Sequence, residues 1–182
     1  MKGYEKMIHD QNIPIYHYRV RKDFKKLLFN WNWELFITLS FIHKVTFGTA
    51  IKETKTWLKH SRQILEKIRY AGIIQVVHYL GDNPHIHVLL TSDPAYPRTL
   101  KDLDWVDELK SPINLMESSW DLSKIGTCKI IPVYDNAGVC RYLARPKNFI
   151  TWDSDRWDFH CYRPNLLKKL CKGNLPKFLK EV

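Results

Sequence analysis

The sequence predicts an α+β protein in which helices flank a central antiparallel β-sheet and pack mainly on one side of it. Segments rich in β-branched and aromatic residues alternate with helical patterns in the order β-α-β-β-α-β-α-β. Few of the connections resemble the strand–helix–strand crossovers of a parallel sheet. The 182 residues suffice for one domain with its own core. We expect an N-terminal extension over 1–33, a core over 34–162 and a basic tail over 163–182.

The first half of the chain predicts a strand and a long helix. Within the N-terminal extension, residues 23–29 allow one or two helical turns. We expect the extension to cover an edge of the sheet, and a DNA-contacting arm is the alternative. Residues 34–41 alternate between a fully apolar face and a mixed face, as in a strand buried mainly on one side. Residues 51–71 carry an apolar stripe at helical spacing, with Thr49 as a candidate N-cap and Gly72 just past the end.

Residues 73–92 have the pattern of a β-hairpin. Two β-branched apolar runs flank the sequence Gly-Asp-Asn-Pro at 81–84, which favours a turn. If these four residues form the loop, His78 lies opposite His87, and His85 shares their face of the sheet. Three imidazoles on rigid strands predict a divalent-metal site, although a His-x-His pair can also be a polar stripe on a solvated face. A register slip of one residue would turn His78 to the other face.

The second half predicts shorter elements. They are a helix over 113–122, a strand over 127–133, a helix over 136–145, a strand over 156–162 and a basic helix from 166 that breaks at Gly173. Pro132 cannot donate to a β-ladder, which favours an edge position for its strand or a bulge. Asp135 or Asn136 would cap the helix that follows, and Pro146 would end it.

The composition favours a nucleic-acid partner. The net charge is +10 and the pI is about 9.4, so a polyanion is the first expected ligand, and a basic protein that merely stays soluble is the alternative. No apolar run reaches the roughly 18 residues that a membrane span needs. The polar segment Met1–Asp10 is not a signal peptide, and the four scattered cysteines lack a Cys-x-x-Cys pair. We therefore expect reduced thiols in a cytoplasmic protein.

Three motifs together resemble the HUH endonucleases, and within them the rolling-circle replication initiators (Rep proteins) of plasmids and phages. Residues 35–41 are similar to the first motif of the family, an apolar and threonine-containing strand. His85 and His87, with Ile86 between them and apolar residues after them, match the His-hydrophobe-His motif. Tyr142, within Arg-Tyr-Leu-Ala-Arg, is similar to the third motif, a helix with a nucleophilic tyrosine. The resemblance spans 34–162 and implies a ferredoxin- or RRM-like fold.

The resemblance implies site-specific nicking and rejoining of single-stranded DNA at a replication origin. Tyr142 would attack the scissile phosphate, form a 5′-phosphotyrosine and release a 3′-hydroxyl. The three hairpin histidines would bind Mn²⁺ or Mg²⁺, which polarises that phosphate. Arg145 stands where the family usually has a lysine. Because arginine does not deprotonate, Arg145 can clamp phosphate but hardly relay a proton, and Lys147 is the alternative for that role.

Three other interpretations compete with this one. A single-tyrosine HUH transposase or a relaxase would use the same chemistry, and a non-catalytic DNA-binding protein could retain the fold. A histidine-triad nucleotide hydrolase also carries His-apolar-His, but it needs a third histidine where this chain has Leu89. The sequence has no Gly-x-x-x-x-Gly-Lys-Ser/Thr loop, so a separate host or replicon helicase would have to unwind the DNA.

Overall fold

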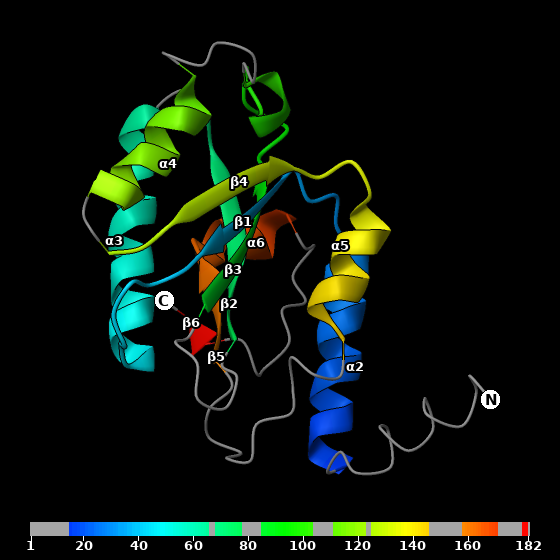
Figure 1. Ribbon diagram of the computed structural model, residues 1–182. Helices are drawn as coiled ribbons and strands as arrows, with labels where there is room; N and C mark the ends of the chain where they lie inside the picture. The colour runs from blue at the N-terminus through cyan, green and yellow to red at the C-terminus, as the bar shows by residue number, and fades with distance from the viewer. Residues whose placement is uncertain are drawn as a thin grey trace, which may run out of the picture.

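The computed structural model describes residues 15–65, 68–77, 85–103, 111–122, 125–145, 158–170 and 180–181. Its sheet has the strand order β4-β1-β3-β2-β5-β6 (Figure 1). The strands are β1 (Leu35–Leu39), β2 (Tyr70–Val77), β3 (His85–Ser92), β4 (Cys128–Pro132), β5 (Asp158–Tyr162) and β6 (Lys180–Glu181). The helices are α2 (Ile15–Phe29), α3 (Phe47–Ile64), α4 (Pro112–Leu122), α5 (Asn136–Leu143) and α6 (Pro164–Leu170), with a 3₁₀ turn, η1 (Leu100–Asp102).

The predicted α+β class with a central antiparallel sheet and flanking helices is confirmed. Strands β1 to β5 pair antiparallel with their neighbours, and the short β6 pairs parallel with β5. The hairpin of β2 and β3 lies in the middle of the sheet, and β3 pairs with β1 as predicted. Strand β4 lies at one end of the strand order, as Pro132 predicted.

Helices cover both faces of the sheet, so the expectation that they pack mainly on one side is wrong (Figure 1). Helices α3 and α4 form one apolar core with the sheet, and α2, α5 and α6 form a second core on the other face. The N-terminal segment makes the difference. It forms a longer helix than the turns expected at 23–29, and it buries Phe24, Leu27 and Leu28 against the face rather than the edge.

Helix α3 begins and ends earlier than the range 51–71 predicts. Thr46 is the N-cap, and its hydroxyl accepts a hydrogen bond from the Thr49 amide at 3.2 Å. The helix ends at Ile64 because β2 begins at Tyr70, so strand pairing overrides the apolar stripe that continues in the sequence. Gly72 is therefore not a helix end but a strand residue within β2.

The hairpin register differs from the predicted one. Gln75 lies opposite His87, where His78 was expected, and Val77 lies opposite His85. Every residue of β2 is buried, because helices cover both faces, so no polar alternation marks one face in the sequence. His78 itself lies outside the residues that the structure describes.

Gly72 permits the close approach of β2 and β3. A Cβ atom at this position would lie 2.2 Å from the carbonyl oxygen of Leu89 and 2.5 Å from the Leu90 side chain. Both distances are shorter than any Cβ contact tolerates, so only glycine fits this point of the ladder. The glycine thus has a packing role in the centre of the sheet.

Candidate functional site

Helix α5 starts at a well-defined cap. The Asp135 side chain accepts a hydrogen bond from the Gly138 amide at 2.8 Å. Asp135 is therefore the N-cap, one of the two candidates that the sequence offered. The helix ends at Leu143, and the backbone amide of Ala144 still bonds to the Cys140 carbonyl at 3.0 Å. These two ends place Tyr142 in the last turn of the helix.

Helix α2 holds α5 in place against the sheet. The Asn136 side-chain amide donates to the Trp31 carbonyl oxygen at 2.6 Å, and Arg21 Nε donates to the Ala144 carbonyl oxygen at 2.8 Å. The buried Cys140 thiol donates to the Leu28 carbonyl oxygen at 3.3 Å. The two helices lie side by side in Figure 1. The N-terminal segment is therefore part of the support of the tyrosine helix.

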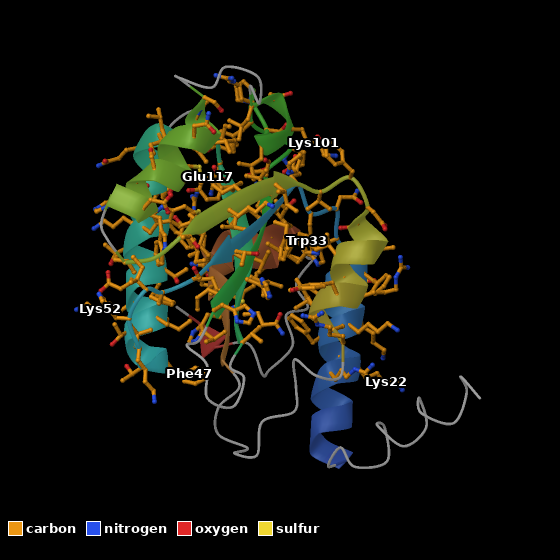
Figure 2. The ribbon with its side chains drawn as sticks, in the orientation of Figure 1. Lys22, Trp33, Phe47, Lys52, Lys101 and Glu117 are labelled. Carbon is orange, nitrogen blue, oxygen red and sulfur yellow. The ribbon has the colours of Figure 1, made fainter. Side chains whose placement is uncertain are left out.

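Trp33 fills the space where α2, α5 and the sheet meet (Figure 2). Its side chain is 2% exposed, and its indole nitrogen donates to the Leu28 carbonyl oxygen at 3.0 Å. Its backbone amide donates to the Asn136 side-chain oxygen at 3.2 Å. One tryptophan thus connects both helices to the start of β1.

An aromatic cluster joins the tyrosine of α5 to the histidines of β3. The Tyr142 ring lies 5.4 Å from the His87 ring and 6.0 Å from the Phe36 ring, measured between centroids. The His85 ring lies 4.9 Å from the His87 ring. Tyr142 is 39% exposed, whereas His87 is 2% exposed. The tyrosine can therefore meet a ligand from solvent while it contacts a buried imidazole.

Four opposed residues cross the sheet beneath this cluster, and we call them the site row. They are Lys129 of β4, Thr38 of β1, His87 of β3 and Gln75 of β2. Opposed residues share a face, so all four lie on the face that α5 covers. The exposed Lys129 sits two strands from His87, about 10 Å away at the usual strand spacing.

Two polar atoms of the site row are buried and have no hydrogen-bond partner among the described residues. They are Nε2 of His87 and Oε1 of Gln75. Both side chains have a partner at their other polar atom. His87 Nδ1 lies 3.4 Å from the Thr38 hydroxyl, and Gln75 Nε2 donates to the Leu143 carbonyl oxygen at 3.4 Å. Buried polar atoms are rarely left unpaired, so the two lone pairs indicate a place for an ion or water.

The electrostatic setting keeps His87 neutral. Its pKa is lowered to about 3, first by burial and then by the nearby charges of His85 and Arg145. If Nδ1 carries the ring proton and donates to Thr38, Nε2 keeps its lone pair. A neutral, oriented imidazole is the form that binds a metal ion.

Arg145 contacts the tyrosine directly. Its guanidinium carbon lies 3.9 Å from the centre of the Tyr142 ring, a cation–π geometry. The sequence predicted that Arg145 approaches the site from the end of the helix, and in the structure Arg145 lies beside Tyr142. Lys147, the alternative for the same role, lies outside the described residues.

The residues present fit a divalent metal through neutral donors. Within the described part of the chain, no three His, Cys, Asp or Glu side chains gather into a metal-binding group. The available set is the imidazoles of His85 and His87 with the amide oxygen of Gln75. Two nitrogen ligands suit a first-row ion such as Mn²⁺ better than Mg²⁺, which prefers oxygen. Gln75 occupies the position opposite His87 that the sequence predicted for His78, and His78 lies outside the described residues.

Sequence reasoning missed Gln75 and Lys129. Gln75 is the one amide side chain within the otherwise apolar run of β2, and an isolated buried amide was a signal that could have found it. Lys129 could be placed in the site row only after the pairing of β4 with β1 was known. Both residues depend on register, which local sequence patterns do not fix here.

The chain matches no protein-family model, no curated protein and no solved structure. None of the helices within the described ranges is long and apolar enough to cross a membrane. Fold and site together define an α+β protein with a histidine–glutamine pair beside a half-exposed tyrosine.

Proposed function

We propose that this protein is a metal-dependent endonuclease that nicks and rejoins single-stranded DNA through Tyr142, as the HUH replication initiators do. One observation carries the proposal. The Tyr142 ring contacts His87 on the face where His87 Nε2 and Gln75 Oε1 are both buried without a partner among the described residues. Each buried polar atom without a hydrogen bond lowers the stability of the fold. Two such atoms beneath Tyr142 would have no purpose if the tyrosine only packed on the sheet.

The covalent step uses the phenol oxygen of Tyr142. Its attack on the scissile phosphorus forms the Oη–P bond and breaks the bond to the 3′ oxygen, which leaves on the opposite side and takes up a proton. The tyrosine gives up its own proton in the same step. The phosphotyrosine keeps the energy of the broken diester, so a 3′-hydroxyl can reverse the reaction and rejoin the strand.

Gln75, His85 and His87 would hold Mn²⁺ or Mg²⁺ beside the tyrosine. When bound, this ion polarises the scissile phosphate and offsets its negative charge. Thr38 orients His87 through Nδ1, which fixes the ring for its ligand role. Arg145 acts as a phosphate clamp beside the ring of Tyr142.

The charge distribution supports a nucleic-acid substrate. The chain carries a net charge of +10, and the exposed Lys129 lies in the site row. Cations near the site would hold the sugar–phosphate backbone on either side of the scissile bond. The proposed substrate is a single-stranded segment of a replication origin, with a separate helicase supplying the unwinding.

The decisive experiment compares Tyr142→Phe with Tyr134→Phe. Tyr134 lies just before α5 and is 90% exposed, so it is a matched tyrosine outside the aromatic cluster. A radiolabelled pool of random single-stranded oligonucleotides with Mn²⁺ should give a protein–DNA adduct on denaturing gels. We expect Tyr142→Phe to abolish the adduct and Tyr134→Phe to retain it.

The same gels separate the competing interpretations. DNA binding by the wild-type protein without any adduct would replace the proposal with a non-catalytic DNA-binding function. An adduct that survives in Tyr142→Phe would move the nucleophile to another tyrosine. Circular dichroism of both variants verifies that each is folded, since Phe preserves the ring and its packing.

A further inference from the structure

A second candidate site lies at the other end of the β2–β3 hairpin. It is a pocket of about 600 Å³, which we call the cationic pocket. It is lined by Lys59, Arg62, Gln63, Ile68, Arg69, Tyr96 and Arg163. Arg69 directly precedes β2, whereas Gln75 of the site row is six residues further along, about 20 Å at the usual strand rise. The pocket is therefore separate from the tyrosine site.

The pocket concentrates positive charge. Lys59 and three arginines line it, and no carboxylate does so among the described residues. Burial lowers the pKa of Arg163, and the like charges of Arg62 and Arg69 lower it further. These cations are thus close enough to repel one another. Such an arrangement costs stability unless an anion is bound between them.

Asp93, a carboxylate paired with Arg69 of the pocket, is already shared. Asp93 is 2% exposed, and its Oδ2 lies 3.9 Å from Arg69 Nε and 4.0 Å from Lys169 Nζ. Its other oxygen accepts a hydrogen bond from the Ala95 amide at 3.1 Å. A single carboxylate divided between two cations leaves the positive charge of the pocket largely uncompensated.

Arg69 and Tyr96 form a preorganised wall. Arg69 Nη1 donates to the Tyr96 hydroxyl at 2.9 Å, and its guanidinium carbon lies 5.2 Å from the centre of the tyrosine ring. Tyr96 is 41% exposed. Proteins that bind nucleotides stack the base on an exposed aromatic ring and hold the phosphate with neighbouring arginines.

Arg163 combines an uncommon backbone conformation with an anchored side chain. Its φ of 57° is in the left-handed region, and among the described residues no other non-glycine residue has a positive φ. Its Nη1 donates to the Tyr70 carbonyl oxygen at 3.4 Å. Strained backbone of this kind persists where the surrounding structure enforces it, often at ligand clamps.

We infer that the cationic pocket binds the phosphate group of a nucleotide, with Arg62, Arg163 and Lys59 as its partners and Tyr96 beside the base. The phosphate can belong to a DNA strand or to a free nucleotide, because the same guanidinium chemistry recognises both. This site makes no use of Tyr142 or of the metal. It stands independently of the proposed nicking reaction.

The test neutralises one cation of the pocket and one outside it. Arg62→Gln removes an exposed charge from the pocket, and Lys52→Gln removes an exposed charge near the start of the same helix (Figure 2). The two positions lie about 15 Å apart along α3. The probes are ATP, inorganic pyrophosphate and a fluorescein-labelled oligothymidine of about twenty nucleotides, titrated by calorimetry or anisotropy at fixed ionic strength.

Arg62→Gln should weaken the binding of at least one probe by about tenfold, because one charge-assisted contact is lost. Lys52→Gln should leave the affinity for that probe within about twofold of the wild-type value. An effect on ATP and pyrophosphate identifies a free nucleotide as the ligand, and an effect on the oligomer alone identifies a DNA strand. Equal weakening by both variants, or no weakening by Arg62→Gln, overturns the inference. Thermal melting verifies that both variants fold. Because Tyr142→Phe should retain all of this binding, failure here is distinguishable from failure of the nicking proposal.

Discussion

At the scale of single residues, the candidate site depends on Gln75. Its amide nitrogen is anchored to the Leu143 carbonyl of α5, while its oxygen is buried without a partner in the described chain. The same side chain thus connects the central strand to the tyrosine helix and presents a lone pair beside His87. A residue with only a packing role would serve better as a leucine of similar size.

We expect Gln75→Leu to lose Mn²⁺ binding while the protein remains folded. The substitution removes the metal-binding oxygen but fills nearly the same volume. The measurement is the shift in melting temperature on addition of Mn²⁺, which should disappear. Gln63→Leu is the matched control, since it makes the same change on α3 away from the site row. An undiminished Mn²⁺ shift in Gln75→Leu would falsify the ligand assignment.

His87 and Tyr142 should respond differently to excess metal. His87→Ala removes a proposed metal ligand and should stop cleavage, but raised Mn²⁺ should restore part of the activity because weakened binding is overcome by mass action. Tyr142→Phe should stay inactive at any Mn²⁺ concentration, because the attacking oxygen is missing. Adduct yield against Mn²⁺ concentration is the readout. Equal rescue of both variants would contradict the roles assigned to them.

At the scale of elements, the β2–β3 hairpin is the central structural unit. It pairs with β1 on one side and β5 on the other, and helices cover both of its faces. Its register decides which residues meet in the site row. Gly72 allows the two strands to approach at the point where a side chain would strike the Leu89 backbone.

Gly72→Ala should destabilise the protein by roughly 3 kcal/mol or more, since the strand backbone must shift to admit the methyl group. Gly48→Ala is the control. The nearest atom to its added Cβ would be 4.0 Å away, and alanine in a helix is favoured by about 0.5–1 kcal/mol. Urea unfolding gives the free energy of both variants. A Gly72→Ala protein as stable as the wild type would contradict the described register.

The sequence predicted the elements whose signals are local. Asp135 marked the start of α5, Pro132 marked β4 as an edge strand, and alternating burial in β1 followed its apolar pattern. The hairpin register could not be read, because β2 is buried on both sides and its sequence does not distinguish the faces. Gln75 was missed for that reason.

The extent of α2 was also missed. The buried residues Phe24, Leu27 and Leu28 have helical spacing, but they lie within a basic segment that looked like an extension. Only the contact with α5 shows that this segment belongs to the core. The helical spacing alone does not show which surface of the protein the segment packs against.

At the scale of the whole molecule, the described structure gathers basic side chains at two separate places. Lys129 and Arg145 lie at the tyrosine site, and the cationic pocket lies at the opposite end of the hairpin. The net charge of +10 exceeds what these places hold, so electrostatic attraction extends over much of the surface. Binding of nucleic acid should therefore depend steeply on ionic strength.

Affinity for an oligothymidine should fall linearly on a plot of log K against log salt concentration. Each phosphate contact contributes roughly 0.7 to the slope for single strands, so Lys129→Gln should reduce the magnitude of the slope by about that amount. Lys55→Gln on α3 provides the comparison, because it lies on the other side of the sheet. A wild-type slope near zero would mean that the basic surface serves another partner.

The contact between Cys140 and α2 gives the molecule an internal chemical probe. The thiol is fully buried, its pKa is raised by burial to about 11, and it faces the Leu28 carbonyl. An alkylating reagent can reach this thiol only when α5 lifts away from α2. The thiol must then be exposed to solvent and lose its proton, because the thiolate is the reactive form. The labelling rate of Cys140 in the native protein, followed by mass spectrometry, therefore reports how often the tyrosine helix detaches. A strand of DNA bound across the site should slow that rate, because it holds the helix down.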